Sequence, residues 1–434
     1  MVNPADLVLQ AAVLPVPPVD SKVKNTVLEV IGLPHEDRAD RILELNKLGF
    51  TWANLDEAPY WIDQIIAIQE DTQQELFSVT QKLWLIFDIA ARFVLGKHDL
   101  YEQLSIPPVL WDGLDWLKPN PSEMLSRYAR FDFSISQSGR IKLLELNADT
   151  PTGYVEASVV TPWMCEQHQL RSSNDSMSTH LHEAWGKEQP QYAACIAYGQ
   201  HLEDSGTINM LVRHSGLNVT CVDCLELWVD EGILKDASGN QIERLFALYP
   251  KEWMSVDDGG EAFAYAIETE NVRLTNSLHA ILLQSKGLQS VIWGLHELQS
   301  DLFTPDQHIT IATYMLPTYN SCVFKGNFVS KSMFGREGGS VQMYNHLGQL
   351  DVKDEAGFDT SQFFPRVYQE RAELPLISLQ CGDFHLLTGV FVINGVPCGL
   401  LGRAGGLITG NASHFIAMGV KTNGSKTNLD DHSL

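Results

Sequence analysis

The sequence predicts a mixed α/β fold, and three segments support that prediction. Residues 72–96, TQQELFSVTQKLWLIFDIAARFVLG, repeat apolar side chains at helical spacing and end on a glycine. Residues 128–150 contain two runs of alternating polarity separated by SQSG, which is the pattern of a β-hairpin. After residue 190, short apolar runs such as YAACIAYG alternate with helical stretches, which is typical of α/β proteins.

The other elements follow from similar patterns. Residues 38–118 are expected to be mostly helical, and residues 323–415 are expected to form a mixed sheet in which Ile393-Asn394-Gly395 makes a turn. The ends, residues 1–22 and 421–434, are expected to be tails. At about 150 residues per domain, 434 residues correspond to two or three structural units.

Composition excludes several classes of protein. The chain has 30 Lys+Arg against 54 Asp+Glu and a net charge of −24, so a nucleic-acid partner is not expected. No apolar run reaches the length of a membrane span, so no membrane partner is expected. Seven cysteines, an odd number in a large chain, fit reduced thiols and a cytoplasmic location. A cationic or amine-bearing small molecule suits the acidic charge, although net charge reports mainly on solubility.

The hairpin contains the strongest chemical signal. Asp132 lies on its first strand, and Glu145 and Asn147 lie two apart on its second, so strand alternation places the latter two on one face. Cross-strand pairing can bring Asp132 to them, and such an oxygen cluster suits Mg²⁺. Arg130 shares that face and could hold a carboxylate or a phosphate. A solvated polar face explains the spacing equally well.

Other segments give weaker signals when each is taken alone. Thr150 and Thr152 either bind a substrate group or make a turn. The glycine-rich stretch after Lys331 either cradles phosphate with its amides or forms a plain hairpin turn. Three further candidates also have ordinary surface or strand explanations: the strand at Tyr368-Gln369-Glu370-Arg371, Lys286 at the start of a helix, and Arg403 after an apolar strand.

Taken together, these segments resemble the glutathionylspermidine synthase family. The block RFDFSISQSGRIKLLELNADTPTGYVEAS is similar to the segment that marks its members. It is followed in the family's order by LFALYPKEWM, LLQSKGLQSVIW, VSKSMFGREGGSV, VYQERAELP and VINGVPCGLLGRAGGLITGNASHF. The resemblance extends from about residue 25 to 420. It implies the short form of the family, without the amidase domain that some members have.

The resemblance implies an ATP-grasp fold with an N-terminal pre-ATP-grasp portion. The expected division is a helical part at 23–125, a metal hairpin and pre-ATP-grasp part at 126–255, and an ATP-grasp part at 256–420. It also implies a ligase in which ATP phosphorylates a carboxylate and an amine attacks the acyl phosphate. The acid would be peptide-like or glutathione-like, and the amine a polyamine or an amino acid.

The family's roles transfer to matching positions. Mg²⁺ would be held by Asp132, Glu145 and Asn147. The acid substrate would contact Arg130, Thr150 and Thr152, and Arg403 would stabilise the transferring phosphoryl group, so that Arg130 and Arg403 are the expected catalytic residues. ATP would be bound by Lys286, Lys331, the loop residues Gly335, Arg336, Glu337, Gly338 and Gly339, and a hinge of Tyr368, Gln369, Glu370 and Arg371.

Phosphoryl transfer depends mainly on positioning and charge neutralisation, and these residue types provide both. Three positions depart from the family's pattern. Ala404-Gly405 replaces an acidic residue that often follows the arginine, Ser332 replaces a proline, and His414 replaces an arginine. The first departure leaves a second hypothesis open, that of a non-catalytic nucleotide-binding protein with a regulatory or interaction role. The sequence leaves the oligomeric state open.

Overall fold

The computed structural model describes residues 27–32, 37–55, 58–186, 191–197, 201–336, 338–354, 364–410 and 412–422. The predicted tail 1–22 lies outside these residues, as does most of 421–434. Lys421 is still the last residue of a strand and pairs with Glu29 at 2.9 Å, so the folded region extends past residue 420.

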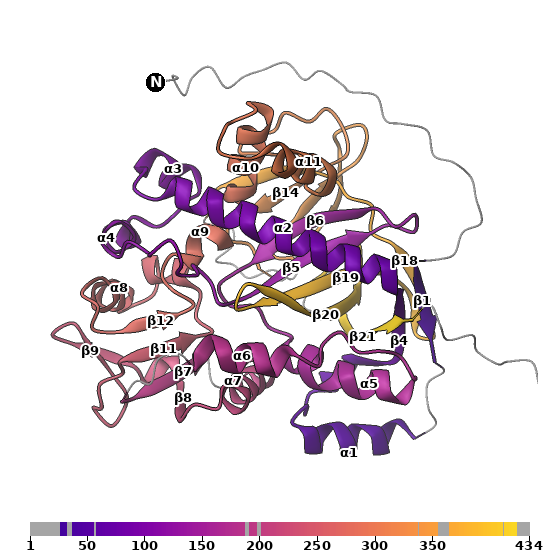
Figure 1. Cartoon of the computed structure of the whole chain (residues 1–434), viewed down its shortest axis with the longest axis horizontal. Coiled ribbons are helices and arrows are strands. Elements are labelled where there is room, and N and C mark those ends of the chain that lie inside the picture. Colours follow the sequence, from indigo (N-terminus) through magenta and orange to yellow (C-terminus); the bar gives the residue numbers. More distant parts are fainter. Residues whose placement is uncertain are drawn as a thin grey trace, which may run out of the picture.

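A sheet of eight strands forms the centre of the molecule (Figure 1). Its order is β1 (Leu28–Ile31), β4 (Trp61–Gln69), β21 (His414–Lys421), β20 (Val396–Gly405), β19 (Gly382–Ile393), β5 (Tyr128–Ile135) and β6 (Ile141–Asn147), with β18 (Leu376–Leu379) also paired to β19. Strands from both ends of the chain therefore meet in one sheet, where β4 and β21 run parallel.

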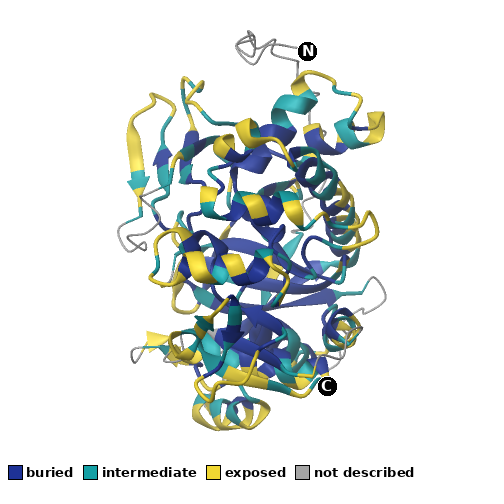
Figure 2. Cartoon of the chain, turned by 90° about the vertical axis from the view of Figure 1, so that its left-hand side faces the viewer, coloured by how far each residue is buried: buried dark blue, intermediate teal, exposed yellow. Residues whose placement is uncertain are grey.

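Both faces of this sheet are covered. The helix α2 (Glu70–Val94) crosses one face, and α5 (Thr161–Gln167) and α6 (Met177–Trp185) cover the other (Figure 1). Alternate residues of β19 enter the two cores: Val390 packs on the α2 side, and Phe391 on the α6 side. Figure 2 shows the resulting buried central layer.

The expectation of a mostly helical segment at 38–118 is wrong for β4. All but the last of its nine residues are buried, because this inner strand is covered on both faces. Its sequence, WIDQIIAIQ, therefore lacks the alternation that identifies a half-exposed strand. The expected helix at 72–96 is confirmed as α2, which begins two residues earlier. The remaining elements of this region are α1 (Arg38–Leu48), β2 (Asn54–Leu55), β3 (Ala58–Pro59), α3 (His98–Gln103) and α4 (Trp111–Trp116).

A second, parallel sheet confirms the α/β pattern after residue 190. Its order is β12 (Arg273–Thr275), β11 (Arg244–Ala247), β7 (Ala193–Ala197) and β8 (Val219–Asp223). The helix α7 (Leu202–Ser215) connects β7 to β8, and α8 (Gly260–Glu268) lies between β11 and β12. A small ribbon of β9 (Trp228–Asp230) and β10 (Ile233–Lys235) lies beside α8.

A third sheet contains part of the region predicted as mixed. Its order is β13 (Thr318–Tyr319), β17 (Arg366–Glu370), β14 (Phe328–Ser332), β15 (Gln342–Tyr344) and β16 (Leu350–Lys353). The segment 323–415 is thus divided between two sheets, since β18 to β21 belong to the central one. The helices α9 (Ala280–Gln284), α10 (Gly287–Glu297) and α11 (Pro305–Tyr314) all contact α2, and α10 also packs against β13 of this sheet.

The predicted hairpin is confirmed. Strands β5 and β6 pair antiparallel, with Asp132 opposite Glu145 and Arg130 opposite Asn147. The turn at Asn394-Gly395 is also confirmed, because both residues have positive φ, 53° and 78°. The central sheet takes strands from all three predicted parts of the chain, whose boundaries remain a prediction. None of the helices in the described part of the chain is long and apolar enough to cross a bilayer.

Candidate active site

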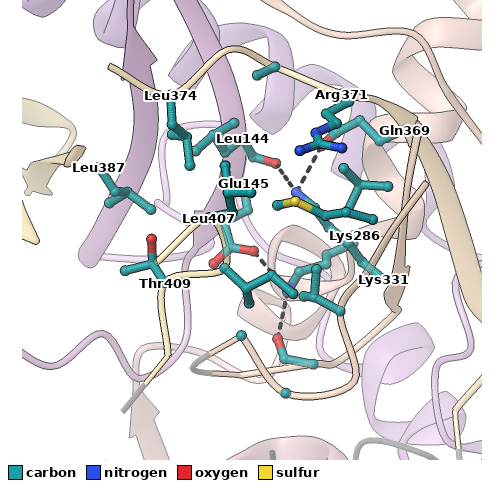
Figure 3. A pocket seen from close by; sticks show the side chains of 18 of the residues that line it. Leu144, Glu145, Lys286, Lys331, Gln369, Arg371, Leu374, Leu387, Leu407 and Thr409 are labelled. Carbon is teal, nitrogen blue, oxygen red and sulfur yellow. Dashed lines mark hydrogen bonds and ion pairs between the residues drawn. The ribbon is translucent and has the colours of Figure 1, made fainter. Parts of the chain in front are cut away.

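Two adjoining cavities lie where the third sheet meets the central sheet. The first is lined mainly by apolar side chains and contains Lys286 and Lys331 (Figure 3). The second is lined mainly by polar and charged side chains. Four residues line both cavities: Glu145, Gly338, Leu387 and Thr409. The cavities therefore adjoin at Glu145, on the predicted metal hairpin.

The three predicted metal ligands lie together in the second cavity. The amide nitrogen of Asn147 donates to Asp132 at 3.1 Å, and Glu145 is the cross-strand neighbour of Asp132. Two carboxylates and an amide oxygen form a hard donor set that suits Mg²⁺, so these residues fit the expected ion. The described residues contain no group of three His, Cys, Asp or Glu side chains that could hold a metal. The set proposed here differs from such groups because its third ligand is an asparagine.

Arg130 binds one of these ligands. Its Nε and Nη2 donate to the two oxygens of Asp132 at 2.7 and 2.9 Å, and its Nη1 donates to the carbonyl of Thr152 at 2.7 Å. The side chains of Arg130 and Asp132 are 7% and 2% exposed. Gly389 on β19 leaves room for the pair, since a Cβ there would lie 2.9 Å from Arg130 Cδ. These contacts use three of the five guanidinium N–H groups, so in the structure Arg130 orients Asp132.

Glu145 and the two lysines determine the charge at the junction. Lys286 Nζ lies 3.3 Å from Glu145 and donates to the carbonyl of Gly335 at 2.6 Å. Burial alone would raise the pKa of Glu145, but Lys286 and Lys331 outweigh that effect and lower the pKa to about 2. Burial is also the main reason why the pKa of Lys331 is lowered to about 8. At neutral pH the junction therefore contains the Glu145 carboxylate and a mostly protonated Lys331.

Lys331 is held in place by two acceptors. Its Nζ donates to the side chain of Gln369 at 2.8 Å and to the carbonyl of Leu144 at 3.1 Å (Figure 3). Gln369 also binds Gln289 and Thr318, which fixes its orientation. Lys286 is the residue before α10, as the sequence predicts.

The predicted hinge is only partly at the cavity. Gln369, Glu370 and Arg371 line the first cavity, whereas Tyr368 lines neither. The ring of Tyr368 packs instead near Phe328, with the two ring centroids 6.2 Å apart. The sequence did not show which face of this strand meets the cavity.

The glycine-rich segment is the connection of a hairpin, because β14 pairs antiparallel with β15. Gly335, Gly338 and Gly339 line the first cavity, whereas Arg336 lines the second. Arg336 binds both carboxylate oxygens of Glu252 at 2.9 and 3.1 Å and donates to the hydroxyl of Thr150 at 2.6 Å. Glu337 lies outside the described residues.

Arg403 lies inside β20 and not after it, and lines the second cavity together with Thr150 and Thr152. Its Nη2 donates to the carbonyl of Gly410 at 3.0 Å. Gly405 lies against Ser413, because a Cβ there would lie 2.3 Å from the Ser413 hydroxyl, which would have to move for any larger residue.

Among the residues of the second cavity that sequence reasoning missed are four with acidic or aromatic side chains: Tyr60, Glu203, Asp204 and Trp253. Tyr60 precedes β4, the strand that was not predicted. Glu203 and Asp204 begin α7, where acidic residues are ordinary helix starters. Trp253 lies within the LFALYPKEWM block, which was noted only for its likeness to the family. Of these four residues, only Trp253 could have been found from the sequence, through the likeness of its block to the family.

With this geometry established, the comparisons with known proteins identify the family. Residues 33–421 match the family described as "Glutathionylspermidine synthase preATP-grasp". The chain belongs to the glutathionylspermidine synthase family. A Haemophilus influenzae protein named "Putative acid--amine ligase" is 28% identical over 422 residues, which cover 89% of this chain and 98% of that protein. The Escherichia coli "Bifunctional glutathionylspermidine synthetase/amidase" is 22% identical over 341 residues, which cover 71% of this chain and 52% of that protein.

Membership confirms three predictions: the family, the ATP-grasp type of fold and the enzyme class, an ATP-dependent carbon–nitrogen ligase. The match to the bifunctional protein spans about half of that protein's length.

Proposed function

We propose that the chain uses ATP and Mg²⁺ to join a carboxylate to an amine through an acyl phosphate. The observation that supports this proposal most directly is the junction of an apolar cavity with a charged one at Glu145. A nucleotide has the same division, with an apolar base at one end and anionic phosphates at the other.

The first cavity suits ATP. Leu144, Val329, Met343 and Leu407 provide apolar surface for a base. Lys286 and Lys331 would contact the phosphates, and the glycines of the loop allow close approach of backbone amides. Mg²⁺, held by Asp132, Glu145 and Asn147, would neutralise phosphate charge when bound.

The second cavity suits the acid substrate on one side. Thr150 accepts a hydrogen bond from Arg336, which orients its own O–H away from that cation and makes it available to a substrate carboxylate. Arg130 and Thr152 are the other proposed contacts. Arg403, fixed within β20, would stabilise charge on the transferring phosphoryl group.

The second cavity also suits an amine. Its lining includes the carboxylates of Glu203 and Asp204 and the aromatic side chains of Tyr60 and Trp253. Carboxylates and ring faces both attract ammonium groups. We therefore propose a peptide-like or glutathione-like acid, with a polyamine or an amino acid as the acceptor.

The test is hydroxamate formation. Hydroxylamine intercepts acyl phosphates, so the enzyme should convert an acid to its hydroxamate only with Mg-ATP, releasing ADP. A panel of amino acids, short peptides and glutathione covers the proposed acids. If no acid in the panel gives hydroxamate or ADP, the proposed reaction is wrong.

A further inference from the structure

A fully buried carboxyl contacts Tyr60, which lines the second cavity. Glu156 has no exposed surface and begins a π-helical turn, Glu156–Val160. Its Oε1 accepts hydrogen bonds from Trp52 Nε1 at 2.8 Å and from the Tyr60 hydroxyl at 3.0 Å. Its Oε2 has no hydrogen-bond partner among the described residues.

Burying Glu156 in this way lowers the stability of the fold, which suggests that the carboxyl has a function. A buried carboxylate normally has hydrogen bonds on both oxygens, and leaving one oxygen without a partner is unfavourable. The position is nevertheless tightly held. Trp52 packs against α7 at Gly206, where a Cβ would lie 2.1 Å from the indole ring. Of the two side chains that donate hydrogen bonds to Glu156, Tyr60 lines the second cavity and Trp52 does not.

Tyr60 connects the buried carboxyl to the cavity. Because its O–H donates to Glu156, the lone pairs of its oxygen remain available on the other side, where an ammonium group could donate to them. The charged groups that act on this hydroxyl are Glu156 from behind, Glu203 from α7 and Arg403 from β20. An amine drawn to Glu203 would therefore come close to the Tyr60 oxygen.

We propose that Tyr60 and Glu156 form a proton relay that converts the acceptor ammonium into the neutral amine that attacks the acyl phosphate. The proposal rests on the proposed ligase function. The ammonium N–H proton moves to the Tyr60 oxygen as the Tyr60 O–H proton moves to a carboxylate oxygen of Glu156. The products are the neutral amine, a restored phenol and a protonated Glu156, so charge and atoms balance without another reactant.

The surroundings suit these roles. Burial raises the pKa of Glu156 above its ordinary value, against the donors Trp52 and Tyr60 and the charge of Arg130, and a higher pKa makes the carboxylate a stronger base. Burial also raises the pKa of Tyr60, so its hydroxyl stays protonated and can accept one proton as it donates another.

The test compares two nucleophiles of similar size. Methylamine is charged at neutral pH and must lose a proton, whereas hydroxylamine is already neutral. With an acid that gives hydroxamate, Tyr60→Phe and Glu156→Gln should each lower the rate with methylamine by roughly 10²-fold, as for loss of general-base catalysis. The rate with hydroxylamine should stay within about threefold. Glu156→Gln keeps the side-chain shape, and Tyr154→Phe removes a buried hydroxyl bonded to His214, so the latter should change neither rate.

Raising the pH should restore the rate of Glu156→Gln with methylamine, because the solvent then supplies neutral amine, and a purely structural defect would not respond in this way. Three outcomes would overturn the relay: the variants lose the same rate with both nucleophiles, they lose no rate with methylamine, or the wild type reacts only with hydroxylamine. Absence of hydroxamate from the wild type would instead refute the ligase function, and the relay with it.

Discussion

Lys331 is a half-buried amine whose charge depends on its neighbours. Its pKa is lowered to about 8, mainly by burial and also by Lys286, while Glu145 and Asp132 oppose the shift. A lysine with this pKa is mostly charged at pH 7 and mostly neutral at pH 9. Nucleotide phosphate near the amine would favour the charged form, so ATP binding and protonation of Lys331 should be coupled.

We therefore expect ATP affinity to fall as the pH rises above about 8, by up to about tenfold per pH unit. Lys331→Arg, which stays charged, should remove this dependence, and Lys331→Ala should weaken binding at every pH. Calorimetric titration from pH 7 to 9 measures all three proteins. A wild type and a Lys331→Arg variant with the same pH dependence would contradict the assignment.

Arg403 should separate binding from turnover. It lies in β20, faces the second cavity and does not line the first. We expect Arg403→Ala to leave Mg-ATP affinity within about threefold and to lower turnover by roughly 10²-fold or more, the loss typical of a preorganised donor. Calorimetry and ADP release measure the two quantities. Loss of affinity matching that of Lys331→Ala would refute the separation.

At the scale of elements, the connection between β14 and β15 is anchored to a distant part of the chain. Arg336 joins it to Glu252, which is 1% exposed and belongs to the turn after β11. Beside this pair, Lys251 and Asp149 form a second buried ion pair, in which the side chains are 2% and 0% exposed. The position of this connection at the first cavity thus depends on a distant segment, whose residues Pro250 and Trp253 line the second cavity.

Removing one partner of a buried pair leaves the other charge unpaired. Glu252→Ala should therefore lower the free energy of local opening at residues 333–336 and 338–341 by about 3 kcal/mol. Hydrogen exchange of these amides should accelerate accordingly. Glu373→Ala is the matched control, because its pair with Arg140 is exposed, with side chains 64% and 72% accessible, and should change nothing. Unchanged exchange in Glu252→Ala would show that the pair does not anchor the loop.

How much of this could be predicted from the sequence differs between elements. The β5–β6 hairpin is flanked by a clear turn and places Arg130, Asp132, Glu145 and Asn147 by local pairing alone, so its sequence was sufficient. The strand β4 was missed because it is buried on both faces. The partners Glu252 and Glu156 could not be found, because their contacts join segments far apart in the chain, and no local pattern encodes them.

For the whole molecule, the central sheet determines where the chemistry lies, because β5, β6, β19 and β20 all contribute residues to the two adjoining cavities. Residues from all three predicted parts of the chain line the two cavities, since Tyr60, Glu145 and Arg403 each come from a different part. The proposed nucleotide and substrate sites therefore both require the central sheet to be assembled.

The central claim is that ATP activates a carboxylate as an acyl phosphate, and isotope transfer tests it most directly. An acid that gives hydroxamate would be labelled with ¹⁸O in its carboxylate and converted with Mg-ATP and an amine. Mass spectrometry of the released phosphate should find one ¹⁸O atom per phosphate, because the carboxylate oxygen stays on phosphorus when the amide forms. Unlabelled phosphate, or label in AMP, would contradict the account.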